Sequence, residues 1–197
     1  MVRPESQTRQ FDFQTRSAEE GQELWVEGYA VVFNRETVLF EMDGNEYKEE
    51  ISPDAFADTR MDDVIFNYNH QGKVMARTRN HTLTLSVDDK GLFIRARLDG
   101  TQEGRELYEE IQGGYVDRMS FQFTVAEESY DREARKWTIR RVKRLYDVSA
   151  VSIPAYDDTS ISARRDAALE ADAQARRVEV AEAALARARV EIKLKLS

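Results

Sequence analysis

The sequence predicts a mainly β protein with flanking helices, whose strands form a closed or nearly closed barrel, followed by an alanine-rich C-terminal helix. Three observations support this. Between residues 24 and 153, short segments rich in β-branched and aromatic residues recur, and such residues favour strands. Turn-forming clusters separate these segments, and helical patterns are few, as is typical of barrels. The composition changes near residue 160, which sets the C-terminal part of the chain apart.

The expected strands are apolar segments with turn signals on their flanks, namely residues 24–33, 64–68, 83–87, 92–98, 119–125, 136–144 and 145–153. The third and fourth flank an Asp-Asp-Lys-Gly cluster, which predicts a hairpin. In the fifth, polar and apolar residues alternate as they do in a half-buried strand. The last two form either a long final pair or one bent strand.

Three helices are expected. Pro53 suits a first helical position, which predicts a single helical turn over 53–57. Residues 101–112 place their apolar side chains on one face and end at a Gly-Gly pair, a common helix stop. The long helix covers residues 163–197, where Gly, Pro and aromatic residues are absent and 11 of 35 residues are alanine.

The C-terminal segment has a net charge of +2, which leaves −10 for the rest of the chain. A thin apolar seam runs along it at helical spacing, formed by Val178, Ala181, Leu185, Ala188 and Ile192. A solvated helix and a coiled-coil partner surface both fit this pattern. The predicted organisation is therefore an N-terminal extension over 1–21, a β domain over 22–162 and a helical tail over 163–197.

The composition excludes several kinds of protein. The 197-residue chain has no cysteine and two histidines, which excludes thiolate nucleophiles, Cys-ligated metal sites and multi-histidine metal sites. No run approaches the ~20 apolar residues of a membrane span, and residues 1–20 lack the apolar core of a signal peptide. The net charge of −8 argues against coating DNA, and the basic run 140–144 fits a solvated strand better than a nucleic-acid site. We expect a soluble, cytoplasmic protein.

The two histidines are the scarcest groups that could carry chemistry. The sequence contains neither a glycine-rich phosphate loop nor a Gly-x-Ser-x-Gly motif, so no cofactor or metal is expected. His70 follows an expected strand, where an imidazole can exchange protons or simply cap a loop. His81 lies among polar residues and fits an exposed turn.

Two further residues stand out. Ser120 lies on the polar face of an expected strand, where an ordinary polar residue and a nucleophile both fit. Asp147 lies inside an apolar strand, and a carboxylate there is costly unless it is paired. It could bond to a turn, or it could orient an imidazole. The chain order His70, Ser120, Asp147 differs from that of chymotrypsin-like, subtilisin-like and α/β-hydrolase enzymes.

Five motifs resemble those of the HK97-type phage prohead maturation proteases in order and spacing, and they lie at residues 27–34, 50–56, 69–70, 114–123 and 145–156. The resemblance extends from about residue 22 to about residue 165. It implies a fold similar to that of the herpesvirus assemblin proteases, which are serine enzymes built on a β-barrel. It also implies that Ser120 is the nucleophile and His70 the general base. Asp147 takes the position of a third member that is usually Glu, and Gln122 stands where the family commonly has Gly.

The resemblance implies a serine endopeptidase without a cofactor or metal. Its substrates would be the scaffolding segment of the major capsid protein and the protease itself, inside the immature prohead in the host cytoplasm. The related herpesvirus enzymes suggest a homodimer, and neither nucleic acid nor membrane is an expected partner. The main alternative is a non-catalytic structural or scaffold-binding protein of the virion on the same barrel, and a small-molecule esterase or amidase is a third.

The oxyanion of such a reaction needs fixed donors. The amides of Gly113 and Gly114, or an arginine near the final strand, are candidates.

Overall fold

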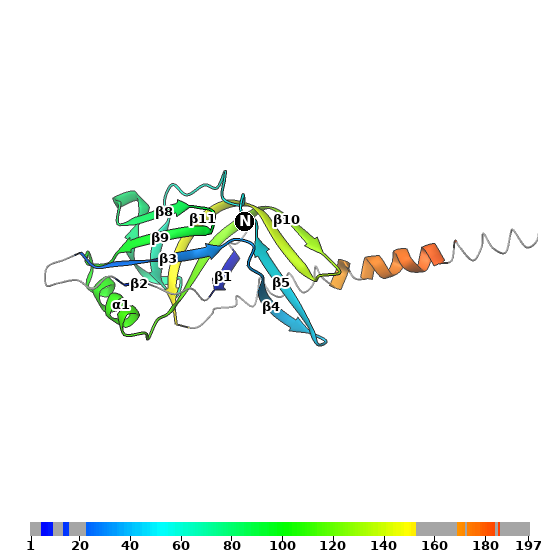
Figure 1. Cartoon of the computed structure of the whole chain (residues 1–197), viewed down its shortest axis with the longest axis horizontal. Helices are drawn as coiled ribbons and strands as arrows, with labels where there is room; N and C mark the ends of the chain where they lie inside the picture. Colours follow the sequence, from blue (N-terminus) through cyan, green and yellow to red (C-terminus); the bar gives the residue numbers. More distant parts are fainter. Residues whose placement is uncertain are drawn as a thin grey trace, which may run out of the picture. The chain divides into compact units, whose positions relative to one another are not determined.

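The computed structural model describes residues 5–9, 14–15, 23–152, 169–171, 173–183 and 185. The chain divides into two compact units, residues 1–160 and residues 161–197. In its described residues the first unit contains two β-sheets, one α-helix and a short 3-10 helix (Figure 1). The prediction of a mainly β protein with few helices is therefore confirmed. The domain limits at residues 21 and 162 stay predictions.

The larger sheet has seven strands, which are β1 (Glu5–Arg9), β4 (Thr37–Met42), β5 (Asn45–Ile51), β6 (Ile65–Tyr68), β7 (Gln71–Arg77), β10 (Arg118–Asp131) and β11 (Lys136–Val151). Along its main path the order is β1-β10-β11-β5-β4, and β6 joins β11 to β7. The long strand β11 organises this sheet. It pairs antiparallel with β10 along its length, parallel with β5 at its beginning and parallel with β6 at its end.

The smaller sheet is antiparallel and has the order β2-β3-β9-β8, formed by β2 (Gln14–Thr15), β3 (Trp25–Val32), β9 (Gly91–Arg97) and β8 (Leu83–Val87). The hairpin between β8 and β9 is confirmed. Asp88 closes its turn, because its Oδ1 accepts hydrogen bonds from the amides of Lys90 and Gly91 at 2.8 and 2.9 Å. The hydroxyl of Tyr29 donates to Asp88 Oδ2 at 2.7 Å.

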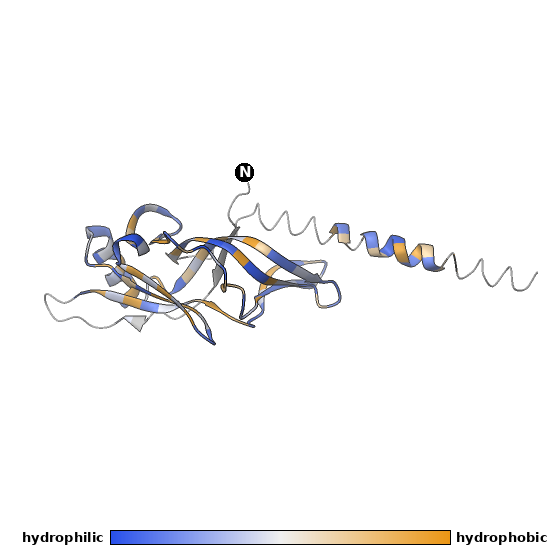
Figure 2. Cartoon of the chain, turned by 90° about the horizontal axis from the view of Figure 1, so that it is seen from above, coloured by the Kyte–Doolittle hydropathy of each residue, from blue (hydrophilic) through white to orange (hydrophobic). Residues whose placement is uncertain are grey.

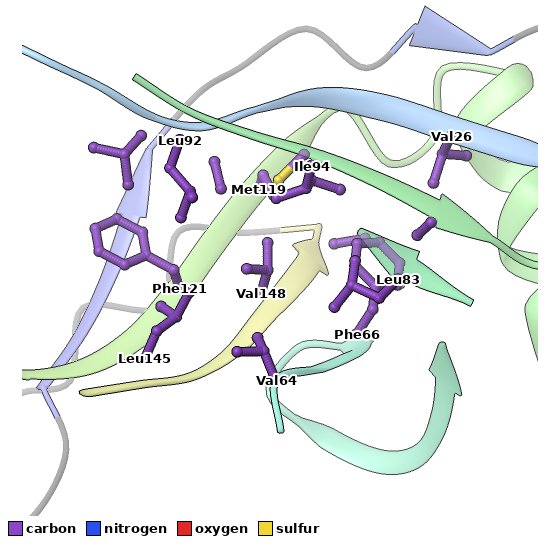
Figure 3. Packing of buried hydrophobic residues seen from close by; sticks show 14 of the residues in the cluster. Val26, Val64, Phe66, Leu83, Leu92, Ile94, Met119, Phe121, Leu145 and Val148 are labelled. Carbon is purple, nitrogen blue, oxygen red and sulfur yellow. The ribbon is translucent and has the colours of Figure 1, made fainter. Parts of the chain in front are cut away.

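One cluster of buried side chains draws on both sheets (Figure 3). Phe66 and Phe121 of the larger sheet and Leu92 and Ile94 of the smaller one are fully buried in it. Hydrophilic and hydrophobic residues alternate along the long strands, as Figure 2 shows, so one face of each strand supplies the cluster. This alternation is what the sequence displayed in residues 119–125.

The prediction of a closed barrel is wrong. In the described part of the chain, the strands of the two sheets hydrogen-bond only within their own sheet, and the sheets do not close on one another. The alternation of polar and apolar residues along a strand does not indicate which strands pair. A strand with one buried face has the same sequence pattern in a barrel and in two packed sheets, because only the pairing partners differ.

Helix α1 (Gln102–Gln112) is confirmed. Thr101 caps it, since its hydroxyl accepts from the amide of Gly104 at 2.9 Å, and the apolar face of the helix is buried. The expected helical turn over 53–57 is wrong, because the structure has turns there. Their hydrogen bonds are of the i to i+3 type, and the carbonyl of Ala55 accepts from Val142 of β11 at 2.8 Å instead of extending a helix.

Five strands, β1, β2, β4, β5 and β7, were not expected from the sequence. Three glutamates and one lysine lie in β5, and the first four residues of β7 are exposed, so neither strand shows a long apolar pattern. The last two expected strands are one continuous strand, β11.

In the second unit, residues 169–171, 173–183 and 185 are helical. Val178, Ala181 and Leu185 of the predicted seam are exposed within this unit, and Ala188 and Ile192 lie outside the described residues. Both interpretations of the seam therefore stay open. Across the described residues, no helix has both the length and the apolar character of a membrane span.

Candidate active site

His70 lies in the tight turn that joins β6 to β7. The turn has two residues, Asn69 and His70, and both have positive φ angles, 49° and 57°. Such angles match the hairpin turn that suits the twist of antiparallel strands. Asn69 links this turn to the end of β11. Its backbone amide donates to the carbonyl of Ala150 at 2.9 Å, and its side-chain Oδ1 accepts from the backbone amide of Ser152 at 3.2 Å. The imidazole is thus held against the end of β11.

Ser120 lies on β10 and Asp147 on β11, on the face of the sheet opposite the hydrophobic cluster. Met119 and Phe121, the neighbours of Ser120, are fully buried in that cluster. Because successive side chains of a strand point to opposite faces, Ser120 faces the other way. The antiparallel register places Ser120 opposite Ser149, two residues beyond Asp147 on the same face. Adjacent strands therefore bring a hydroxyl and a carboxylate to one region.

The turn and the two strands place three side chains in line. His70 Nε2 lies 2.6 Å from Ser120 Oγ, and His70 Nδ1 lies 2.7 Å from Asp147 Oδ1. With Nδ1–H donating to the carboxylate, Nε2 is left as an acceptor for the serine hydroxyl. Side-chain exposure is 7% for His70 and 6% for Asp147, so the pair is shielded from water. Groups arranged in this way can move a proton from the hydroxyl to the ring.

Two buried polar residues next to Asp147 were not singled out from the sequence. Ser149 Oγ lies 2.9 Å from Asp147 Oδ1 and is also hydrogen-bonded to the side chain of Asn67 on β6. Ser149 is fully buried and Asn67 is 4% exposed. The spacing of Asp147 and Ser149 on one strand could have indicated a shared face. The pairing of β6 with β11 places Asn67 beside Ser149, and no pattern in the sequence indicates this pairing.

The other predicted residues lie apart from this arrangement or are engaged elsewhere. His81 is exposed and ends the short 3-10 helix (Thr78–Asn80), as expected of a turn residue. The amides of Gly113 and Gly114 donate to the carbonyls of Glu109 and Ile111 at 2.8 and 3.1 Å. Because the helix end uses both donors, they are not available to an oxyanion in this state.

The basic run on β11 is paired locally. Arg140 donates to the hydroxyl of Ser129 at 3.1 Å. Arg141 lies 3.2 Å from the carboxylate of Asp58, and the guanidinium of Arg144 lies over the ring of Tyr146. The expectation of a solvated strand with local partners agrees with these contacts.

An ion pair links β7, which follows His70, to α1. Lys73 donates to the carboxylate of Glu103. This hydrogen bond lowers the pKa of Glu103 and raises the pKa of Lys73 from their ordinary values. Lys73 is exposed, so the pair adds little to stability. Within the described ranges, no group of three or more histidine and carboxylate side chains is arranged to hold a metal ion.

Comparison with known proteins places the chain in a family. The chain is similar to a prohead protease of Enterobacteria phage HK97, with 28% identity over 150 residues. That alignment covers 74% of this chain, and the chain spans 62% of the length of that relative. Among solved structures, the fold is similar to that of the bacteriophage T4 capsid assembly protease, with a TM-score of 0.50 at 14% identity, over 77% of this chain and 99% of that one. The model of the caudovirus prohead serine proteases matches residues 11–173, well over half of the chain, and the chain therefore belongs to that family.

Proposed function

We propose that this protein is a serine endopeptidase that acts in the maturation of a phage prohead. The observation that carries the proposal is the line of Ser120, His70 and Asp147, with 2.6 and 2.7 Å between successive polar atoms. Membership of the prohead serine protease family supports it. We assign the nucleophile to Ser120, the general base to His70 and the orienting acid to Asp147.

The reaction follows from the roles of these atoms. His70 Nε2 accepts the proton of Ser120 as Oγ attacks the carbonyl carbon of a peptide bond. Asp147 Oδ1 holds Nδ1–H and stabilises the imidazolium that results. The imidazolium then gives its proton to the leaving amine, which departs as the acyl-enzyme forms. Water, deprotonated by His70, hydrolyses this ester and restores the serine hydroxyl.

An aspartate suffices where the family usually has glutamate, because the turn that carries His70 lies close to β11. The 2.7 Å contact needs no additional methylene. Ser120 itself is fully buried, so cleavage requires a local movement that admits the peptide to Oγ.

The proposed substrates are the scaffolding segment of the major capsid protein and the protease itself. The site of action would be the interior of the immature prohead in the host cytoplasm. A homodimer, which is expected from the family resemblance, remains part of this proposal.

The test is to express the full chain together with its capsid protein and to follow the capsid protein by gel and mass spectrometry. We expect shortened capsid protein with the wild type and intact capsid protein with Ser120→Ala. The exposed histidine provides a matched control, since His81→Ala should cleave like the wild type. Intact substrate with every variant, together with co-purification of the capsid protein, would favour the alternative of a non-catalytic scaffold-binding protein. Cleavage of small esters but not of peptides would favour an esterase.

A further inference from the structure

We propose that Ser149 and Asn67 are positioning residues that hold Asp147 in place through a chain of hydrogen bonds from β6 to β11. This inference rests on the proposed function, since it concerns the same catalytic line. It adds two residues that act through the carboxylate of Asp147, and it predicts the direction in which their hydrogens point.

The hydroxyl of Ser149 has more potential acceptors than protons. Ser149 Oγ is within hydrogen-bonding distance of two oxygens, Asp147 Oδ1 at 2.9 Å and Asn67 Oδ1. A serine hydroxyl has one proton, so it can donate to only one of them. Asp147 is a buried carboxylate that can only accept, and a buried charge without donors is strongly destabilising. The hydroxyl of Ser149 therefore donates its proton to Asp147 Oδ1.

In the contact between Asn67 and Ser149, the side chain of Asn67 must therefore be the donor and Ser149 Oγ the acceptor. The oxygen and nitrogen of an amide side chain are nearly equal in shape, and a half-turn about the last side-chain bond exchanges them. After that half-turn, Asn67 Nδ2–H donates to the lone pair of Ser149 Oγ. The result is a continuous chain in which Asn67 donates to Ser149, Ser149 donates to Asp147 and His70 donates to Asp147. Within this chain, the Ser149 proton, one amide proton of Asn67 and the Nδ1 proton of His70 each have an acceptor.

The backbone places these residues in one row. Ser120 on β10, Ser149 on β11 and Asn67 on β6 are neighbours in the registers of three adjacent strands. Paired residues on adjacent strands point to the same face of a sheet, so their polar groups converge without help from a loop. All three are buried, and their rotamers are therefore restricted by packing. Sites held by strands are more rigid than sites held by loops.

This placement explains how one carboxylate oxygen can hold the ring. Asp147 Oδ1 accepts from both Ser149 and His70, so the hydroxyl of Ser149 adds a second restraint on the carboxylate. Without Ser149 the carboxylate could rotate, and the Nδ1 contact would lose its alignment. The effect should appear in the chemical step and not in substrate binding, because Asp147, which these residues hold, stabilises a charge that exists only during the reaction.

The experiment is a double-mutant cycle on the full chain, measured by cleavage of a peptide from the capsid protein and by the rate at which a fluorophosphonate modifies Ser120. The variants are Ser149→Ala, Asp147→Ala and the combination of the two. Loss of a hydrogen bond to a charged group predicts that Ser149→Ala lowers kcat roughly 10-fold to 100-fold while KM changes little. In the Asp147→Ala background, the same substitution should change the rate by less than about 3-fold, because Ser149 acts only through Asp147.

A shape-matched pair separates the hydroxyl from packing. Ser149→Thr and Ser149→Val have nearly the same volume, but only threonine can donate a proton. We expect the threonine variant to be at least about tenfold faster than the valine variant, even if the additional methyl slows both. Asn67→Asp keeps the size of the side chain and removes its donor, and it should lower kcat about as much as Ser149→Ala.

Each outcome has a distinct meaning. A wild type that cleaves the peptide, with equal losses from Ser149→Ala in both backgrounds, would overturn the positioning role and leave the proposed function intact. Equal rates for the threonine and valine variants, or a wild-type rate for Asn67→Asp, would do the same. A wild type that neither cleaves the capsid peptide nor is modified at Ser120 would overturn the proposed function, and this inference would fail with it.

Discussion

Replacing Asp147 with asparagine removes one charge from the catalytic line and keeps its shape. In the proposed mechanism His70 becomes an imidazolium during the reaction, and Asp147 stabilises that charge across the 2.7 Å contact. The two charges are then about 4 Å apart between their centres, where a pair with an effective dielectric constant of about 20 interacts by ~4 kcal/mol. This dielectric value is appropriate because both side chains are shielded from water. Since ~1.4 kcal/mol corresponds to a tenfold change in rate, Asp147→Asn should lower kcat by about 10³-fold.

The assay is cleavage of a capsid-derived peptide at saturating and subsaturating concentrations, which separates kcat from KM. We expect KM to stay within about 3-fold of the wild type, because Asp147 stabilises a charge that exists only in the reaction and not in the bound substrate. Circular dichroism should show the same fold. Asp62→Asn is the matched control, since Asp62 is an exposed partner of Arg60 outside the site and should leave both constants unchanged. A decrease in kcat of less than tenfold, with the fold intact, would refute the electrostatic role of Asp147.

Three further predictions test other parts of the account. Phe121→Ala removes a fully buried ring from the hydrophobic cluster that both sheets share, and it should lower the free energy of unfolding by about 3–5 kcal/mol. Urea denaturation measures this change. A loss below ~1 kcal/mol would show that the stability of the two sheets does not depend on this cluster. The hydrogen bond from Tyr29 and two backbone amides lower the pKa of Asp88, so its ionised form stabilises the folded state. Asp88→Ala should therefore be less stable than the wild type above pH ~4, and the difference should disappear as the pH falls through the lowered pKa; a difference that persists in acid would contradict this. The coiled-coil interpretation of the C-terminal seam predicts that deleting residues 163–197, most of the second unit, leaves cleavage of a short peptide unchanged and reduces incorporation into proheads; equal incorporation would contradict that interpretation.

The strand patterns that could be predicted from the sequence are those that depend on local alternation. Met119 and Phe121 face the core and Ser120 faces away from it, which follows from a period of two and needs no knowledge of the partner strands. The hairpin at Asp88 and the cap at Thr101 are also local, because each involves hydrogen bonds between residues three or fewer positions apart.

What could not be predicted depends on which strands pair. The barrel was expected because alternation records burial on one face, and it contains no information on whether the two sheets share an edge. Strands β5 and β7 were missed because their residues are largely polar and several are exposed. For the candidate site, His70, Ser120 and Asp147 stood out in the sequence and their roles were implied by the family resemblance. Their proximity depends on the β6–β7 turn meeting β11. Asn67 could not be found, because its contact with Ser149 spans 82 residues and depends on the parallel register.

The most direct test of the central claim is to identify the residue that a fluorophosphonate modifies, in a preparation that cleaves the capsid peptide. We expect a single adduct on Ser120, found by mass spectrometry, that forms at least about 10³-fold more slowly in His70→Ala because the hydroxyl then has no base. An adduct on another residue, or a rate that does not depend on His70, would contradict the assignment of Ser120 as the nucleophile and His70 as its base.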